Sequence, residues 1–336
     1  MAKGKIKVAI NGFGRIGRAA FKILLDSKKY EVVGVNDLAP AESLAYLLKY
    51  DTVYGVYPKK VIHKGQDIFV GSKKYHIIAE PDPKKLPWKK LKVDVVLECT
   101  GRFVKNGAAA AHVKAGAKAV IISAPAKGGG DVETFLLGVN EEGYKNQKVV
   151  SNASCTTNCV APVAQVLVSK FGVEKAMMTT IHSYTADQGL VDGPHKKDPR
   201  RGRSAAQNII PTSTGAAVAT AQVIPELEGL FDGLAVRVPT VVCSLSDFTF
   251  VLKKDVTVKQ INNALTTASK QLKYKGILGV TTDPVVSSDF IGDSRSSIVD
   301  LSLTKVVGGN MVKIIAWYDN EWGYSNRLVE MIDQMK

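Results

Sequence analysis

Cys155 is the side chain whose neighbours best suit a nucleophile. It lies in SNASCTTNC (151–159), after a strand-like segment and at the start of a helical pattern over about residues 156–170. At a helix start, a thiol meets the positive end of the helix dipole and free N–H groups, which favour the thiolate and lower the pKa of the thiol. Cys159, one turn later and followed by apolar residues, suits a buried position instead. The sequence therefore predicts covalent catalysis through Cys155.

His182 is the candidate base for this thiol. A histidine within hydrogen-bond reach of a cysteine takes up its proton and activates it as a nucleophile. His182 lies near the end of a strand-like segment, on the same expected face as Thr180 and Tyr184. The four other histidines lie in the first half of the chain or in a basic loop: His63, His76, His112 and His195. The pairing of His182 with Cys155 is a hypothesis, and a structural histidine on a strand is the alternative.

A glycine-rich turn near the N-terminus has the pattern of a dinucleotide site. Gly12, Gly14 and Gly17 form G-x-G-x-x-G between a predicted strand and a predicted helix. Such glycines allow a tight turn and bring the backbone close to a pyrophosphate at the helix start. Asp37 ends the second strand about 20 residues on, where a carboxylate accepts hydrogen bonds from ribose hydroxyls and repels a 2′-phosphate. The pattern favours NAD over NADP, and the alternative is a helix-capping turn with no ligand.

The composition argues against several other classes of protein. Four cysteines in 336 residues, none with the spacing of a zinc knuckle, predict neither a disulfide framework nor a metal site. The net charge is +14, but the lysines are scattered in pairs without interleaved aromatic residues, so a nucleic-acid partner is not expected. The apolar runs are too short to cross a bilayer, and the N-terminal segment lacks the apolar core of a secretory signal. We therefore expect a cytoplasmic protein that binds no membrane.

The elements that must position these residues follow one pattern up to about residue 123. Short apolar strands alternate there with helical segments, which is typical of βαβ units and a parallel sheet. The expected strands are residues 6–10, 31–35, 93–99 and 119–123, the expected helices are 16–25, 42–49 and 106–115, and residues 61–79 suggest an antiparallel insert. This pattern predicts a Rossmann-type dinucleotide-binding domain over residues 1–154.

Beyond residue 149 the pattern changes to longer strands with few helices between them. The expected strands are residues 175–184, 235–252 and 311–318, the expected helices are 156–170, 258–272 and 322–335, and residues 186–204 are expected to form a long loop. Pro162 predicts a kink or a later start in the first of these helices. A chain of this length exceeds the usual size of one core. We therefore predict an α/β protein in which an α+β catalytic domain with a mixed or antiparallel sheet (155–318) follows the Rossmann-type domain.

Six motifs, in order along nearly the whole chain, resemble those of the phosphorylating glyceraldehyde-3-phosphate dehydrogenase family. They are NGFGRIGR (11–18), SNASCTTNC (151–159), the strand that carries His182, STGAA (213–217), VRVPT (236–240) and WYDNEWGYSNR (317–327). The resemblance implies NAD-dependent oxidation of glyceraldehyde 3-phosphate in glycolysis or gluconeogenesis. Cys155 would attack the aldehyde to give a thiohemiacetal, and His182 would handle the proton. Hydride transfer to NAD would leave a thioester, from which inorganic phosphate would release 1,3-bisphosphoglycerate.

The same resemblance implies further site residues and an assembly. Around the attacking phosphate it places Ser154, Thr156, Thr214 and Gly215, and around the other phosphate it places Thr185, Arg201 and Arg237. For NAD it places Arg15 and Ile16 at the pyrophosphate, Asp37 at the adenosine ribose, Ser123 nearby and Asn320 at the nicotinamide amide. It also adds the C-terminal segment 319–336 to the NAD-binding domain. Finally, it implies a homotetramer in which residues 186–204 lie between subunits.

Two positions depart from the common pattern of the family. Pro81 stands where many members carry a basic residue near the adenine, which bears on cofactor affinity. Val218 stands where lysine is common. This departure either changes the binding of phosphate or is a substitution on the surface without effect on the site. The runner-up is the related erythrose-4-phosphate dehydrogenase, which shares the cysteine and the histidine. Thr185 and the STGAA segment favour the three-carbon substrate.

Overall fold

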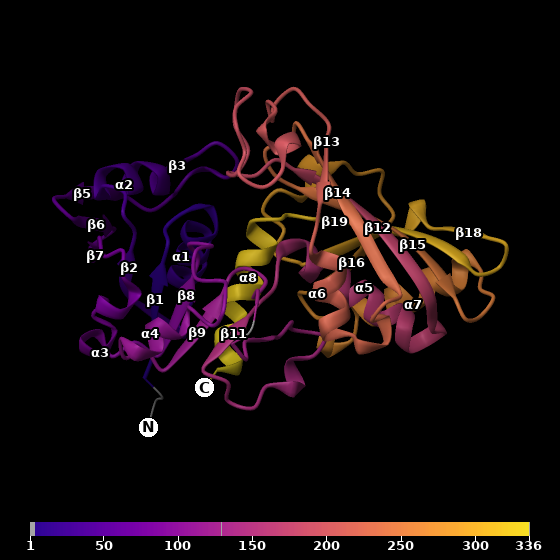
Figure 1. Ribbon diagram of the computed structural model, residues 1–336, viewed down its shortest axis with the longest axis horizontal. Coiled ribbons are helices and arrows are strands. Elements are labelled where there is room, and N and C mark those ends of the chain that lie inside the picture. Colours follow the sequence, from indigo (N-terminus) through magenta and orange to yellow (C-terminus); the bar gives the residue numbers. More distant parts are fainter. Residues whose placement is uncertain (1–3, 129, 336) are drawn as a thin grey trace. The chain divides into compact units, whose positions relative to one another are not determined.

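The computed structural model describes residues 4–128 and 130–335, and the chain folds into two compact units. The first unit contains the chain up to Phe135, then Glu141–Ala153, and the chain from Ser325 onward. The second unit contains Leu136–Asn140 and Ser154–Tyr324. Figure 1 shows the elements of both units, coloured along the sequence. One unit boundary falls directly before Ser154 and Cys155, so the candidate nucleophile begins the main part of the second unit.

The first unit is built on a largely parallel sheet. The strands of this unit are β1 (Ile6–Asn11), β2 (Tyr30–Asn36), β3 (Tyr50–Asp51), β4 (Gly55–Val56), β5 (Val61–Lys64), β6 (Asp67–Val70), β7 (Lys73–Ile78), β8 (Val95–Glu98), β9 (Ala119–Ile122), β10 (Glu133–Thr134) and β11 (Val149–Ser151), of which β3 and β4 pair with each other in a separate small sheet. The main sheet has the order β10-β11-β9-β8-β1-β2-β7-β6-β5 among the described residues. Pairing is parallel from β10 to β7, and β5 and β6 add an antiparallel hairpin at the edge.

Helices follow the parallel strands of this unit: α1 (Arg15–Asp26), α2 (Ala41–Lys49), α3 (Trp88–Leu91) and α4 (Ala110–Lys114). The central strands are apolar and buried because helices cover a parallel sheet on its faces. The last residues of β1, β2 and β8 are polar: Asn11 lies opposite both Asn36 on β2 and Glu98 on β8. The carboxyl ends of three neighbouring strands therefore bring an amide, a second amide and a carboxylate to one edge of the sheet.

The second unit has a mixed sheet with helices packed against it. Its elements are α5 (Cys155–Phe171), β12 (Val173–Ser183), β13 (Ile210–Ser213), α6 (Ala216–Val223), β14 (Phe231–Val238), β15 (Ser244–Leu252), α7 (Val258–Ser269), β16 (Leu278–Thr281), β17 (Ser297–Asp300), β18 (Lys305–Val307) and β19 (Met311–Tyr318), and α8 (Trp322–Glu330) begins in this unit. The strand order is β13-β14-β12-β15-β19-β17-β16, with β18 paired to β19. Pairing is antiparallel except for β12 with β14 and β16 with β17.

Alternation along β15 explains how the second sheet builds its core. Every second residue from Ser244 to Leu252 is buried, including Phe248 and Phe250. The helix α5 packs against this sheet, and most of its residues from Thr156 to Leu167 are buried (Figure 1). Such a helix derives its stability from packing rather than from propensity. The predicted fold class, a Rossmann-type sheet plus an α+β unit with a mixed sheet, is confirmed.

Three local predictions were wrong. The later start considered for the helix that contains Pro162 was wrong, whereas the kink stays a prediction: α5 begins at Cys155 and continues through the proline, because burial of the helix outweighs one missing hydrogen bond. Residues 235–252 are not one strand but β14 and β15, separated by the turn that contains Pro239. The helix expected at residues 106–115 is regular only over Ala110–Lys114. No helix in the described part of the chain is long and apolar enough to span a membrane.

Candidate active site

Cys155 is the first residue of α5, and its position follows from the cap of that helix. Ser154 is the N-cap residue, and its Oγ accepts a hydrogen bond of 3.1 Å from the backbone N–H of Thr157. Capping fixes the start of the helix one residue before the cysteine. The Cys155 side chain is half-buried, whereas Cys159, one turn later, is fully buried. Of these two thiols, only that of Cys155 lies at the end of the helix.

His182 lies next to Cys155, although 27 residues separate them in sequence. Its Nε2 is 3.5 Å from the Cys155 Sγ, and its Nδ1 is 2.7 Å from the carbonyl oxygen of Ser183. A carbonyl oxygen only accepts hydrogen bonds, so Nδ1 carries the proton and donates it. In a neutral ring this leaves the lone pair of Nε2 facing the thiol. The structure therefore brings the two predicted residues together in the geometry of a thiol and its base.

Burial governs the protonation of this pair. Burial raises the pKa of the Cys155 thiol, although contact with Thr156 and the charge of Arg237 act in the opposite direction. Burial, together with the positive charge of Arg237, lowers the pKa of His182 to about 3. The pair therefore rests as a neutral thiol and a neutral imidazole. The expectation that the helix start would lower the pKa of Cys155 was wrong, because desolvation of the charged form outweighs the helix dipole.

Tyr318, at the end of β19, supports the pair and was not among the predicted site residues. Its hydroxyl is 3.1 Å from the Thr156 Oγ1 and 2.8 Å from the Thr180 Oγ1. Its ring meets the ring of His182 edge to face, with centroids 6.0 Å apart. Thr180 and His182 are both buried, which agrees with their expected common face on β12. The position of Tyr318 in the WYDNEW motif was the only sequence signal for it.

The three residues expected at one phosphate position form a connected cluster. Arg237 donates from a terminal guanidinium nitrogen to the Thr185 Oγ1 at 2.7 Å and to the Ser183 carbonyl at 3.2 Å. Arg201 donates to the Thr212 Oγ1 at 2.8 Å, to the Ser213 carbonyl at 3.1 Å and to the Asp187 carboxylate at 3.2 Å. The Nε of Arg237 is buried without a hydrogen-bond partner within the described residues. Two guanidinium groups and a hydroxyl in one place are suited to an anion.

Asp187 completes this cluster and was also missed. Its carboxylate accepts a hydrogen bond from the Thr185 hydroxyl and lies against Arg201. Burial acts to raise the pKa of Asp187, but the Thr185 hydroxyl and the charges of Arg237 and Arg201 hold it below its ordinary value. The carboxylate therefore stays ionised and orients the Thr185 hydroxyl and the Arg201 guanidinium group. The only sequence signal was an acidic residue two positions after Thr185.

The residues expected at the other phosphate position are more dispersed. Ser154 caps α5, and Thr156 faces Tyr318 at the start of the same helix. Thr214 accepts a hydrogen bond of 3.2 Å from the Ala216 N–H, at the start of α6. Gly215 is the N-cap residue of α6 and has open space where a side chain would lie. Across the described residues, no hydrogen bond joins Thr214 or Gly215 to Ser154 or Thr156.

The glycines of the dinucleotide motif have three different tasks in the first unit. Gly12 has φ of +94°, and a Cβ there would lie 2.8 Å from the backbone of Cys99 and Thr100. A Cβ on Gly17 would lie 2.0 Å from the Gly12 carbonyl oxygen. Gly14, the N-cap residue of α1, has open space instead, and α1 has no acidic residue in its first turn. The turn is therefore packed on one side and open at the helix start, which is suited to an anion.

A cavity of about 260 Å³ opens beside this turn, at the carboxyl ends of the strands. It is lined by Asn11, Gly12, Gly14, Asn36, Asp37, Leu38, Glu80, Pro81, Pro83, Cys99, Thr100, Arg102 and Phe103. Asp37 accepts hydrogen bonds from the N–H groups of Phe13 at 2.7 Å and Ala39 at 2.9 Å. These bonds hold its carboxylate beside the glycine turn. Acceptor capacity remains on both oxygens for ligand hydroxyls.

The other residues expected to bind the cofactor lie at the ends of elements. Arg15 begins α1 and pairs with Asp51 at 2.7 Å, and Ile16 follows it in the first turn. Ser123 follows β9, and its N–H donates to the Glu98 carbonyl at 3.0 Å. In the second unit, the Asn320 Oδ1 accepts hydrogen bonds of 3.0 Å from the hydroxyls of Ser183 and Ser244. This arrangement turns the Asn320 amide nitrogen away from the serines.

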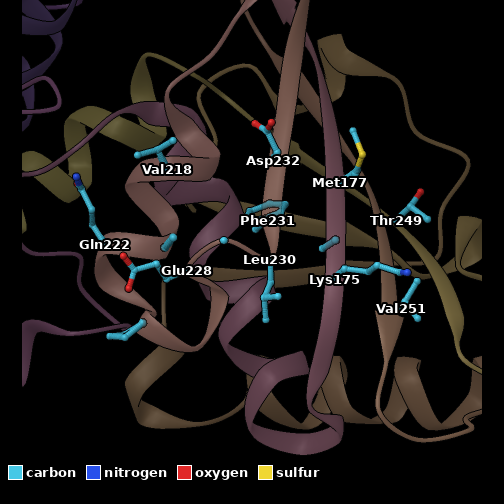
Figure 2. Close-up of a pocket in the computed structure, with 14 residues that line it drawn as sticks. Lys175, Met177, Val218, Gln222, Glu228, Leu230, Phe231, Asp232, Thr249 and Val251 are labelled. Carbon is cyan, nitrogen blue, oxygen red and sulfur yellow. The ribbon is translucent and has the colours of Figure 1, made fainter.

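A second cavity in the second unit contains none of these residues. It measures about 960 Å³ and lies over β12, β14, β15 and α6. Figure 2 shows Met177 and Val218 among its lining side chains, and both are largely exposed, by 63% and 61%. No cluster of His, Cys, Asp and Glu in the described part of the chain could hold a metal ion.

Comparison with known proteins gives two matches to domain families. Residues 6–106 match the family described as glyceraldehyde 3-phosphate dehydrogenase, NAD binding domain, and residues 154–320 match the C-terminal domain of the same enzyme. The glyceraldehyde-3-phosphate dehydrogenase of Priestia megaterium (strain DSM 319 / IMG 1521) is 53% identical over 328 residues, 97% of each chain. Glyceraldehyde-3-phosphate dehydrogenase 1 of Bacillus subtilis (strain 168) is 52% identical over 328 residues, again 97% of each chain. Glyceraldehyde-3-phosphate dehydrogenase 1 of the yeast Kluyveromyces lactis is 48% identical over 331 residues, 98% of this chain and 99% of the relative.

Proposed function

The chain belongs to the glyceraldehyde-3-phosphate dehydrogenase family, and from this premise we propose that it oxidises D-glyceraldehyde 3-phosphate with NAD and phosphate to 1,3-bisphosphoglycerate. The resemblance of its motifs to this family is confirmed by the matches over both units. The observation that carries the catalytic proposal is the 3.5 Å approach of the His182 Nε2 to the Cys155 Sγ. The match to an NAD-binding domain supports NAD as the cofactor.

Cys155 and His182 would carry the chemistry on the substrate carbon. The Cys155 sulfur bonds to the aldehyde carbon, and the thiol proton passes through the His182 Nε2 to the aldehyde oxygen, giving a thiohemiacetal. In the oxidation step the hydroxyl proton of this intermediate goes to His182. NAD, when bound, would supply the acceptor for the hydride that the former aldehyde carbon loses, and the oxidised carbon is then a thioester on the Cys155 sulfur. Inorganic phosphate then attacks the thioester carbon, the C–S bond breaks, and the sulfur takes back its proton from His182.

The neutral resting state of the pair suits this sequence of proton transfers. A base whose lone pair already faces the thiol accepts its proton without turning, since Nδ1 is held by the Ser183 carbonyl. The Cys155 thiolate and the His182 imidazolium form only as the sulfur attacks, so the resting enzyme does not hold two buried charges. Arg237 favours the thiolate through its charge and disfavours the imidazolium. His182 would therefore pass the proton on rather than keep it.

Two anion positions would hold the phosphates. We assign Thr185, Arg201 and Arg237 to one, supported by their connection through Asp187 and by the unpartnered Nε of Arg237. We assign Ser154, Thr156, Thr214 and Gly215 to the attacking phosphate, supported by the two helix starts that carry them. Val218, one turn into α6, is exposed and is not among the anion-binding groups.

The cofactor residues would divide between the two ends of NAD. Gly12, Gly14, Arg15, Ile16 and Gly17 would form the pyrophosphate turn, Asp37 would bind the adenosine ribose, with Ser123 nearby, and Asn320 would bind the nicotinamide amide. The open space at Gly14 and the two N–H groups that orient Asp37 support this fit. Residues 1–154 with 319–336 would act as the NAD-binding domain and residues 155–318 as the catalytic domain, in a cytoplasmic enzyme.

Exposed apolar residues in the second unit support the proposed homotetramer. Leu190 and Val191, in the loop between β12 and β13, are 78% and 77% exposed. Met177 and Val218 line the cavity of the second unit that Figure 2 shows. Large exposed apolar patches mark protein contacts. Sedimentation equilibrium should therefore give about four times the chain mass of 36.1 kDa, and a monomer at micromolar concentration would contradict the proposal.

An assay of NADH formation tests the proposed reaction. Purified protein with NAD and glyceraldehyde 3-phosphate should form NADH continuously only when phosphate or arsenate is present, because the thioester must be released. Erythrose 4-phosphate should react more slowly. Faster turnover of erythrose 4-phosphate would favour the related four-carbon enzyme, and turnover indifferent to phosphate would contradict the proposal.

A further inference from the structure

A buried set of polar side chains in the first unit lies behind the dinucleotide pocket. Glu98 is the last residue of β8, His112 lies in α4, and Trp88 begins α3 (Figure 1). The side chains of Glu98 and His112 are fully buried, and Trp88 is completely buried as well. None of the three is among the residues assigned to cofactor or substrate. Burying a carboxylate costs several kcal/mol unless it is well compensated, so this set requires an explanation.

The Glu98 carboxylate is saturated with hydrogen bonds from two sides. Its Oε2 accepts from the Asn11 Nδ2 at 2.6 Å and lies 2.9 Å from the His112 Nε2. Its Oε1 accepts from the backbone N–H of Thr100 at 2.8 Å and from the Thr100 hydroxyl. An ionised carboxylate has about four acceptor positions. All of them are occupied, so Glu98 is the acceptor in these four contacts.

Trp88 fixes the state of His112. The Trp88 Nε1–H can only donate, and it lies 2.9 Å from the His112 Nδ1. Nδ1 must therefore be the unprotonated nitrogen, and Nε2 carries the proton that is donated to Glu98. In a doubly protonated ring, the Nδ1–H of His112 and the Nε1–H of Trp88 would both be donors and would point at each other. The tryptophan thus holds the histidine as one neutral tautomer, which points its single N–H at the carboxylate.

Two of the donors to Glu98 form the walls of the dinucleotide pocket. Asn11 directly precedes Gly12, and Thr100 lies where a Cβ on Gly12 would meet its backbone at 2.8 Å. Asn11 also accepts, through Oδ1, a hydrogen bond of 2.7 Å from the Asn36 Nδ2. Asn36 in turn donates to the Glu80 carbonyl at 3.0 Å and accepts from the Glu80 N–H at 3.0 Å. Each of these residues except Glu98 lines the cavity.

We infer that Glu98 is a positioning residue for the dinucleotide: its carboxylate, oriented by His112 and Trp88, joins Asn11 to Thr100 and so sets the separation of the Gly12 turn from the opposite wall. The inference rests on the proposed binding of NAD at this turn. A purely structural role would be served at lower cost by apolar side chains, as in the neighbouring core around Val96. The polar side chains around Glu98 instead continue to the wall of the pocket, through Asn11 on β1, Asn36 on β2 and Thr100 after β8.

Substitution of Glu98→Gln tests the role with little change of volume. A glutamine has only one oxygen, so its NH₂ group faces either the Asn11 and His112 donors or the two Thr100 donors. One wall must therefore shift. We expect the Kd for NAD, measured by calorimetry, to rise roughly tenfold, as for one lost charge-assisted hydrogen bond. The KM for glyceraldehyde 3-phosphate at saturating NAD should stay within twofold of the wild-type value.

Val96→Ala is the matched control on the same strand. Val96 is completely buried in the core behind β8, and its truncation lowers stability without removing a hydrogen bond. It should lower the melting temperature while the Kd for NAD stays within twofold of wild type. A Glu98→Gln protein that binds NAD as tightly as wild type would overturn the positioning role. Failure of the unaltered protein to bind NAD would instead overturn the proposed function on which the inference rests.

Two measurements keep the inference testable if Glu98→Gln does not fold. In an NMR spectrum of protein labelled with ¹⁵N-histidine, the signals of the wild-type His112 ring should be those of a neutral imidazole protonated on Nε2 at pH 7. The chain has five histidines, so these signals must be assigned among five rings. An imidazolium, or the Nδ1–H tautomer, would overturn the orienting role.

In Trp88→Phe the donor to Nδ1 is lost, so His112 should become a mixture of its two neutral tautomers. The Kd for NAD should rise, as we expect in Glu98→Gln. An unchanged tautomer and an unchanged Kd in that variant would also refute the inference.

Discussion

The dinucleotide pocket and the catalytic centre use hydrogen bonds in opposite ways. Behind the pocket, Glu98 has four donors, and in the pocket backbone N–H groups fix the orientation of the Asp37 carboxylate, so the groups that set the shape of the site are held in place before any ligand arrives. In the catalytic centre, a neutral thiol faces a neutral imidazole at 3.5 Å, and the Nε of Arg237 is buried without a partner within the described residues. Saturated groups hold a shape, whereas groups with unused capacity are available to the reacting atoms.

The largest expected effect is on the reacting atom itself. In Cys155→Ser the hydroxyl is a far weaker nucleophile than the thiol, so phosphate-dependent NADH formation should fall by about 10⁴-fold or more. NAD binding should be retained, because no atom of the dinucleotide pocket is changed. Stopped-flow NADH formation and calorimetry measure the two quantities.

Cys159→Ser is the control for this substitution. Cys159 is fully buried in α5, and its Sγ lies 3.6 Å from the Ser297 Oγ. Its variant should keep NADH formation within an order of magnitude of wild type. If both serine variants lost activity equally, Cys155 would not be singled out as the nucleophile. If Cys155→Ser lost NAD binding, the catalytic centre and the dinucleotide pocket would not be independent.

The next effect separates the base from the nucleophile. His182→Asn removes the lone pair that faces the thiol, and turnover should fall by about 10²- to 10⁴-fold, the usual contribution of a general base. The rate of Cys155 alkylation by iodoacetamide should fall as well. His63→Asn, on an exposed position of β5, is the control and should change neither rate. An unaltered alkylation rate in His182→Asn would remove His182 from the activating role.

The two sites also differ in how far the sequence predicts them. The glycines at 12, 14 and 17 lie within one turn, so their spacing alone indicates a dinucleotide site. The catalytic centre is assembled from distant segments: Thr156 and Tyr318 are 162 residues apart, and Thr185 and Arg237 are 52 apart. Long-range pairing of strands brings these side chains together, and no local pattern encodes it. Tyr318 and Asp187 were missed for this reason.

Protonation was the least predictable property. The helix start at Cys155 was correctly identified, yet burial raises the pKa of the thiol rather than lowering it. Burial of the sulfur depends on packing against segments far from α5, such as β12, whose His182 lies 3.5 Å away, and the sequence of α5 does not contain that information. The continuation of α5 through Pro162 has the same cause, since packing outweighed a local preference. Local signals therefore predicted positions better than chemical states.

A smaller effect tests the electrostatics of the catalytic centre through pH. Because Arg237 lowers the pKa of the Cys155 thiol, its removal should raise that pKa further. In Arg237→Met the pH profile of Cys155 alkylation should therefore shift to higher pH. The rate at pH 8 should fall by roughly tenfold for each unit of the shift. Arg200→Met, an exposed cation in the same loop as Arg201, is the control and should leave the profile unchanged. A shift toward lower pH in Arg237→Met would contradict the assigned sign.

The smallest effect returns to the dinucleotide pocket. In Asp37→Asn the repulsion of a 2′-phosphate disappears, but the amide group loses one of the two backbone donors, from Phe13 or Ala39. The Kd for NAD should rise and the Kd for NADP should fall, so their ratio should narrow by about tenfold. Asp26→Asn removes an equal charge at the exposed end of α1 and should leave the ratio unchanged. If Asp37→Asn weakened both cofactors equally, the carboxylate would serve only to hold the turn, and the preference for NAD would have to come from the shape of the pocket around Leu38 and Pro81.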